Sequence, residues 1–110
     1  MARHPADYLI GTLESLVLKT LTHRPMHGYA IARWIEDVTE HALSVEEGSL
    51  YPALYRMEKK GWIEAEWGVS ELGRRAKFYR LTPRGRRRLA AQTAEWARFA
   101  AAVTRLLLAT

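Results

Sequence analysis

The stretch from Ser44 to Thr82 decides the fold of this chain. It reads SVEEGSLYPALYRMEKKG over residues 44–61 and continues as WIEAEWGVSELGRRAKFYRLT over residues 62–82. The first part carries apolar residues at helical spacing and stops at a glycine, which predicts a helix. The second part has two short aromatic and apolar runs around a polar loop with arginines, which predicts a hairpin. A helix is therefore followed at once by a basic hairpin.

The start of this helix is ambiguous. Ser44 and Glu47 form an S-x-x-E capping box, which places the first helical residue at Val45. Pro52 would then lie inside the helix and remove one of its hydrogen bonds. Either the helix kinks near Gly48, or its regular part begins near Ser49. In both cases Gly61 is the expected stop.

The two faces of this helix differ in chemistry. One face is apolar and should pack inward: Leu50, Ala53, Leu54 and Met57. The opposite face carries a small residue, a proline, tyrosines and cations: Gly48, Pro52, Tyr55 and Lys59, flanked by Tyr51 and Arg56. Such an outer face suits binding, although the tyrosines could also cover neighbouring loops.

Two more helices are expected before it and two strands after it. Helical patterns run from about Thr12, the expected N-cap, to Thr22, and from about His27 to Thr39. The strands are expected at Trp62 to Trp67 and at Lys77 to Leu81, with Gly68 and Gly73 bracketing their connection. The predicted fold class is mainly α with a β-hairpin wing, a winged helix-turn-helix plus a long C-terminal helix.

The C-terminal helix should be long enough to seek a partner. Thr82 and Pro83 are an N-cap and a first-turn proline, and nothing breaks the helix before about Leu108. Apolar residues recur at heptad-like spacing, interrupted only by Gln92: Leu89, Trp96, Phe99, Val103 and Leu106. This seam predicts a homodimer interface, with folding back onto the first helices as the alternative. Partial docking of the seam on those helices is expected in either case.

The length and composition limit what the chain is. Its 110 residues make one domain, divided here into an N-terminal arm (1–10), the winged domain (11–82) and the dimerisation helix (83–110). The absence of cysteine excludes disulfides and thiolate zinc sites. We see neither a signal peptide nor a membrane span, and expect a cytoplasmic protein without membrane contact.

Positive charge is concentrated in one region. The net charge is +5, but residues 56–88 hold 11 lysines and arginines against four acids. Clustering of this kind favours a phosphate-facing surface, although a solvated basic surface is the alternative. Arg84, Arg86, Arg87 and Arg88 oppose the dipole of the helix that they begin, so a phosphate or an acidic partner explains them better than helix stability does.

The candidate DNA-binding residues lie on the third helix and the hairpin. Hydroxyls for base edges or phosphates come from Ser49, Tyr51 and Tyr55. Charges for phosphates come from Arg56, Lys59, Arg74, Arg75 and Lys77, the last three at or near the hairpin tip.

Other functional sites have weaker signals. No phosphate loop, nucleophile motif or cofactor signature indicates an enzyme. His23 and His27 are separated by Pro25 and do not suit a metal site. Trp67 and Trp96 could line an apolar pocket for a small aromatic effector at a dimer interface, although aromatic residues more often belong to the core.

Three segments together resemble the PadR family of bacterial transcriptional regulators. They are HGYAIARWIE, VEEGSLYPALYRMEKKGWIEAEW and GRRAKFYRLTPRGRRRL, and the similarity runs from about Gly11 to Leu107. By position, the family's recognition helix falls on Glu47 to Lys60, its wing on Trp62 to Leu81 and its dimer helix on Pro83 to Leu108. A single C-terminal helix is similar to the short members. Leu72 replaces the first of the family's usual glycine pair before the wing arginines.

The resemblance implies a homodimeric repressor that binds double-stranded DNA at an inverted repeat and is released, in some members, by aromatic compounds. The alternative is a winged-helix interaction module that docks on an acidic partner without specific DNA binding. A stable homodimer with a two-fold DNA footprint would favour the first.

Overall fold

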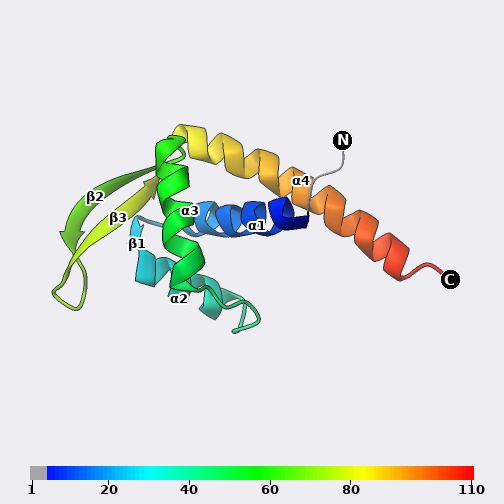
Figure 1. Ribbon diagram of the computed structural model, residues 1–110, viewed down its shortest axis with the longest axis horizontal. Coiled ribbons are helices and arrows are strands. Elements are labelled where there is room, and N and C mark those ends of the chain that lie inside the picture. Colours follow the sequence, from blue (N-terminus) through cyan, green and yellow to red (C-terminus); the bar gives the residue numbers. More distant parts are fainter. Residues whose placement is uncertain (1–4) are drawn as a thin grey trace.

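The computed structural model describes the backbone of residues 5–110 and the side chains of residues 12–110 (Figure 1). Met1 to His4, the start of the expected N-terminal arm, lie outside the described residues. The elements follow in the order α1 (Pro5–Thr20), β1 (Met26–His27), α2 (Gly28–Val38), α3 (Glu47–Lys59), β2 (Ile63–Val69), β3 (Arg75–Leu81) and α4 (Pro83–Leu107). A mainly helical fold with a hairpin wing and a long last helix is confirmed.

The sheet has three antiparallel strands in the order β1-β3-β2. In the hairpin, which we call the wing, Ile63 pairs with Leu81 and Val69 pairs with Arg75. The two-residue strand β1 adds to the other edge of β3, where Met26 lies opposite Tyr79 and His27 opposite Phe78. The middle of β3 is therefore anchored to the residues that precede α2.

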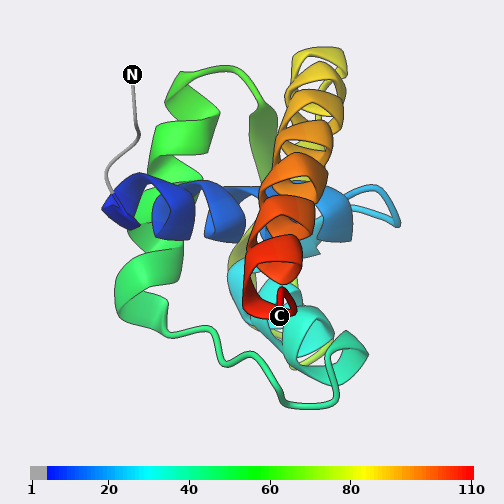
Figure 2. The same cartoon turned by 90° about the vertical axis from the view of Figure 1, so that its right-hand side faces the viewer.

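The core lies where α1 packs against α2, α3 and α4 (Figures 1 and 2). The inward residues expected of α3, namely Leu50, Ala53, Leu54 and Met57, are all buried. They meet Val17 and Leu18 from α1, Ile31 from α2 and Ile63 from the wing. The helical periodicity of α3 thus correctly predicted which side faces inward, and its opposite side stays exposed.

The first helix differs most from the expectation. It begins at Pro5, not after a cap at Thr12, and it ends at Thr20. Thr12 is therefore an internal residue of α1. The expected cap at Thr12 is wrong because the helical spacing of apolar residues begins before it, with Leu9, Leu13 and Leu16 at i, i+4 and i+7.

The third helix begins between the two expected starts. Its first residue is Glu47 and its N-cap is Glu46, which makes no side-chain capping bond. The capping box of Ser44 and Glu47 is therefore wrong as a start signal. Pro52 lies inside the helix, where it cannot donate a backbone hydrogen bond. The helix begins early enough for the Leu50 amide to bond the carbonyl of Glu46 at 2.9 Å.

The strands are longer than expected at their distal ends. Gly68 pairs with Ala76 within the wing, so it does not bracket the turn. The wing turn, residues 70–74, is closed by hydrogen bonds between Ser70 and Arg74 and between Gly73 and Ser70. Gly73 has φ of +75°, the left-handed conformation that glycine adopts readily. Of the three basic residues placed near the tip, Arg74 alone lies within this turn.

The last helix leaves the body of the protein. Figure 1 shows α4 starting beside the end of α3 and projecting beyond the other helices at its C-terminal end. Every residue from Ala101 to Thr110 is exposed. In the described part of the chain, no helix is long and apolar enough to cross a membrane.

Candidate nucleic-acid interface

A groove of about 510 Å³ separates the wing from the helices α2 and α3. Its walls include Gly28 and Tyr29 at the start of α2, Tyr51 on α3, and Trp67 with Arg74 and Arg75 on the wing. Tyr51, Arg74, Arg75 and Lys77, four of the eight predicted DNA-binding residues, line this groove. Ser49, Tyr55, Arg56 and Lys59 lie elsewhere on α3 and are exposed.

The two tyrosines of α3 stand in different environments. Tyr55 is 61% exposed, and the Lys59 ammonium lies 5.2 Å from the centre of its ring. Tyr51 is 45% exposed, and its ring rests against Gly28 so closely that a Cβ on that glycine would lie 2.8 Å from the ring. Tyr51 therefore covers the start of α2, which is close to the covering role considered as the alternative for these tyrosines. It also lines the groove.

The predicted cations are not equally available for phosphates. Lys77 is 3.4 Å from a carboxylate oxygen of Glu58, and Arg56 is 3.9 Å from the buried carboxylate of Glu14. These two join the wing and α1 to α3 as well as carrying charge. Arg75 lies on the ring of Trp67, with 4.6 Å between guanidinium carbon and ring centre, while Arg74 is exposed in the wing turn.

His27 and Glu71 are functional candidates that the sequence reasoning missed. His27 was considered as a metal ligand, but it is the N-cap of α2, where its Nδ1 accepts a hydrogen bond from the Ala30 amide at 3.2 Å. Its Nε2 lies 3.3 Å from Glu71 Oε1 in the wing turn. The HGY motif was the signal that could have pointed to His27. His23 packs instead on Trp34, with ring centres 4.5 Å apart.

Two groups near the groove have shifted pKa values. The pKa of Glu71 is lowered because its carboxylate accepts a hydrogen bond from its own backbone amide and another from His27. The pKa of Tyr79 is raised, first because burial disfavours the phenolate and then because Glu58 and Tyr51 add negative potential. Glu71 is thus held charged and Tyr79 neutral.

The predicted dimer residues divide along α4. Leu89 is half-buried and packs on the core, whereas Trp96 and Phe99 flank a hollow between α4 and α1. Val103 and Leu106 are exposed on the projecting end. The fold-back alternative therefore describes the first half of the seam, and the second half has no cover within the described chain.

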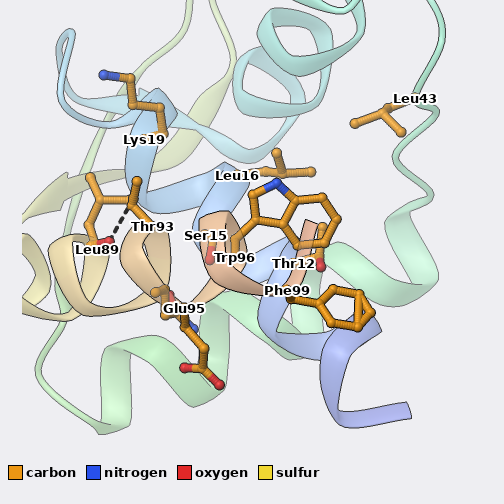
Figure 3. Close-up of a pocket in the computed structure, with 11 residues that line it drawn as sticks. Thr12, Ser15, Leu16, Lys19, Leu43, Leu89, Thr93, Glu95, Trp96 and Phe99 are labelled. Atoms are coloured by element: carbon orange, nitrogen blue, oxygen red, sulfur yellow. Dashed lines mark hydrogen bonds between the residues drawn. The ribbon is translucent and has the colours of Figure 1, made fainter. Parts of the chain in front are cut away.

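The hollow between α1 and α4 has a volume of about 620 Å³ (Figure 3). The ring of Trp96 stands within it beside Leu16, and Phe99 lies near its edge. The Trp96 and Phe99 rings are 5.8 Å apart. Gln92, which interrupts the heptad pattern, also lines the hollow and is buried.

Trp67 does not share this hollow. It is a β2 residue under Arg75 in the groove beside the wing, so one chain does not bring Trp67 and Trp96 into a common pocket. A pocket that both tryptophans line at a dimer interface stays a prediction. Trp67 belongs to β2 of the wing, whereas Trp96 belongs to the α4 seam, and the two line different hollows.

The arginines at the start of α4 have structural neighbours. Arg88 and Lys60 both lie over the ring of Trp62, at 4.9 and 4.7 Å from its centre. Arg84 lies beside Gly61. Figure 1 places the start of α4 at the root of the wing, whereas the wing turn is at the other end of the hairpin. The groove and this second basic region are therefore separate.

Comparison with known proteins identifies the family. The model of the transcriptional regulator PadR-like family matches residues 17–91. An uncharacterised protein of Lysinibacillus sphaericus is 34% identical over 92 residues, which cover 84% of each chain.

Solved structures agree with this match. A transcriptional regulator from Clostridium thermocellum superposes with a TM-score of 0.81 at 28% identity, covering 90% of this chain and 96% of that one. A PadR-like transcriptional regulator from Bacillus cereus superposes with a TM-score of 0.77 at 30% identity, covering 94% and 99%. Both of these structures are of transcriptional regulators. The chain therefore belongs to the PadR-like family of transcriptional regulators.

Proposed function

We propose that the protein is a homodimeric repressor that binds an inverted-repeat operator with α3 as the recognition helix in the major groove and the wing on the flanking backbone. The supporting observation is the groove beside the wing, where Tyr51 of α3 faces Trp67, Arg74 and Arg75 of the hairpin. A protein that binds DNA would act in the cytoplasm of a bacterial cell.

Within this proposal the residues have different tasks. Ser49, Tyr51 and Tyr55 offer hydroxyls to base edges, whereas Lys59, Arg74 and Arg75 offer charge to phosphates. Arg56 and Lys77 add charge while they hold α1 and the wing to α3. The division predicts that hydroxyl and cation variants fail in different ways.

The test is a DNA titration of the dimer at several salt concentrations, with fragments selected from random DNA and scrambled controls. The Arg75→Ala variant should bind all sequences more weakly and reduce the slope of log K against log salt by about 1. The Tyr51→Phe variant keeps the ring on Gly28 and should change the preferred sequence instead. Binding that no salt condition makes sequence-specific would reject the proposal in favour of an acidic protein partner.

We also propose that a small aromatic effector occupies the hollow beside Trp96. The hollow of about 620 Å³ lies within the usual size range of ligand pockets, and its walls include Leu16, Trp96 and Phe99. Planar aromatic compounds should quench tryptophan fluorescence in the wild type and not in Trp96→Phe. A panel that leaves the wild-type spectrum unchanged would contradict this role.

A further inference from the structure

The side chain of His27 links the wing turn to the start of α2, in addition to the backbone pairing that joins β1 to the middle of β3. His27 is only 7% exposed and lies between the end of β1 and the first turn of α2. Its Nδ1 accepts from the Ala30 amide, so in the neutral ring the proton lies on Nε2. That nitrogen is 3.3 and 3.4 Å from the two carboxylate oxygens of Glu71 and donates to them.

Contacts of His27 and of its neighbour Gly28 bring together the wing turn, β3 and α3. The ring stands edge-on to Phe78 of β3, with centres 5.3 Å apart and planes at 83°. The next residue, Gly28, supports the ring of Tyr51 on α3. The contact from His27 to the wing turn therefore restricts where that turn can lie relative to α3, the proposed recognition helix.

Glu71 is an unexpected residue for this place. It lies in the same turn as Arg74, in the wall of the groove that we assign to DNA. A carboxylate there repels phosphates, so its charge by itself should weaken DNA binding. Its contact with His27 offers a reason for its presence.

We propose that His27 and Glu71 form a clasp that fixes the wing turn relative to the recognition helix, so that Glu71 strengthens DNA binding despite its charge. Both are positioning residues, and neither needs to touch DNA. The effect on DNA rests on the proposed DNA-binding function, whereas the clasp itself is a property of the free protein.

The DNA experiment compares two substitutions of one residue. Glu71→Gln removes the charge but keeps an oxygen that can accept from His27 Nε2, whereas Glu71→Ala removes both. We expect Glu71→Ala to bind the selected operator about fivefold more weakly than Glu71→Gln, the factor expected for one partly exposed hydrogen bond. If charge repulsion alone mattered, the two variants would bind equally, and that result would overturn the clasp's effect.

A second substitution separates the clasp from the helix cap. His27→Asn keeps a good N-cap residue but is too short to hold Glu71. Combined with Glu71→Ala, it should add little further loss, because both changes remove the same contact. Fully additive losses would overturn the proposal. Glu66→Ala is the matched control, since it removes an exposed carboxylate of the wing that is not held by His27 and should not weaken binding.

The free protein provides a readout that does not depend on DNA. Imidazole ¹⁵N spectra should show the neutral ring of His27 as the Nε2–H tautomer. Backbone relaxation should show greater mobility at residues 70–74 in Glu71→Ala, and unchanged mobility in Glu71→Gln and Glu66→Ala. A turn equally rigid in all variants would overturn the clasp itself. If the wild type binds no DNA, the proposed function and the clasp's effect on DNA fail, while these spectra still decide whether the clasp exists.

Discussion

Tyr51 of α3, the proposed recognition helix, rests on Gly28, the first residue of α2. Under the proposed function, this contact gives the glycine a role in DNA binding. A Cβ on Gly28 would lie 2.8 Å from the tyrosine ring, which is too close unless the ring moves. Because Tyr51 is only half-buried, the ring can swing outward. The main consequence should therefore be for the recognition surface, with less effect on the core.

We expect Gly28→Ala to weaken DNA binding about tenfold while changing the free energy of unfolding by less than about 1 kcal/mol, because the gain in helix propensity offsets part of the strain. DNA titration and urea unfolding measure the two effects. Gly48→Ala is the stability control, because nothing lies within 4 Å of its added Cβ. It should stabilise the protein by about 0.5–1 kcal/mol. Unchanged DNA binding by Gly28→Ala would contradict the role of this contact.

Tyr79 is a buried phenol whose raised pKa affects stability at high pH. Burial is the main cause, followed by the potentials of Glu58 and Tyr51. In the unfolded chain a tyrosine loses its proton near pH 10, before the folded one does. Raising the pH above about 10 therefore favours the unfolded state, and the stability that Tyr79 supplies below this pH is lost progressively as the folded pKa is approached.

We expect Tyr79→Phe to lose less stability than the wild type as the pH rises above about 10, because the unfolded variant has no phenol to ionise at this position. In an ultraviolet titration followed at 295 nm, the Tyr79→Phe variant should also lack the last phase of tyrosine ionisation, which we assign to Tyr79. Tyr55→Phe, which changes an exposed tyrosine of α3, should keep that late phase. A late phase still present in Tyr79→Phe would assign the raised pKa to another tyrosine.

At the level of residues, the sequence predicted the buried side of α3 but not the clasp. Leu50, Leu54 and Met57 follow a period that only a helix with one inward face explains. His27 and Glu71 lie 44 positions apart, and histidine is not a usual N-cap. A contact of this kind depends on how the wing folds back, which local spacing cannot reveal.

At the junction between the wing and α4, Thr82 and Gly85 hold the first turn of the helix against the wing root. The Thr82 hydroxyl donates to the Gly61 carbonyl at 2.7 Å and accepts from the Gly85 amide at 3.0 Å. A Cβ on Gly85 would lie only 2.0 Å from the Trp62 carbonyl oxygen and 2.8 Å from a methyl group of Leu81. The first turn of α4 can therefore approach the wing root only because Gly85 has no side chain.

We expect Gly85→Ala to destabilise the protein by about 3 kcal/mol, near the upper end of what overpacking costs, because the obstacle is backbone and cannot rotate away. Thermal or urea unfolding of the two proteins measures this loss. Arg86→Ala in the same turn changes an exposed residue and should stay within about 0.5 kcal/mol of the wild type. Equal stability of Gly85→Ala and the wild type would show that α4 starts further from the wing.

Element boundaries could be predicted where a cap and a breaker coincide. Thr82 and Pro83 gave the start of α4 correctly, because the threonine caps and the proline fits the first turn. Ser44 and Glu47 matched a capping box without forming one, since Glu46 holds the cap position. The start of α1 at Pro5 had half of this signal, a proline at the first helical position, but the sequence has no usual capping residue before it.

The shape of the whole molecule follows from the free end of α4. The radius of gyration is 15.2 Å, whereas a compact domain of 110 residues would have about 13 Å. The difference arises because α4 continues beyond the body of the protein (Figure 1). Its apolar residues there are largely exposed, with Leu106 at 76% and Leu107 at 75%.

An exposed apolar helix end of this kind suits a second copy of the chain. A two-fold dimer would cover Val103 and Leu106 and place two recognition helices about one turn of DNA apart, near 34–36 Å. The heptad spacing predicted such a seam from the sequence. Partial docking on the first helices was also expected, but the sequence could not show that it is the seam's first half that packs on α1, because that depends on where α4 crosses the other helices.

We expect the wild type to have twice the 12.6 kDa mass of the chain in light scattering, and Val103→Glu with Leu106→Glu to be a folded monomer. The body of the protein should stay folded because both residues lie outside its core. The monomer should bind the operator at least about 100-fold more weakly. It contacts one half-site only, whereas in the dimer the first bound subunit raises the effective concentration of the second subunit at the other half-site.

Ala101→Glu is the matched control, because it adds a carboxylate to an exposed position on the other side of α4 and should leave both the mass and the DNA affinity unchanged. A dimer that survives both seam substitutions would place the interface elsewhere. Since α3 and α4 both pack on α1, moving the interface would also change the spacing of the two proposed recognition helices. The operator's half-site spacing therefore provides an independent measurement of the same seam.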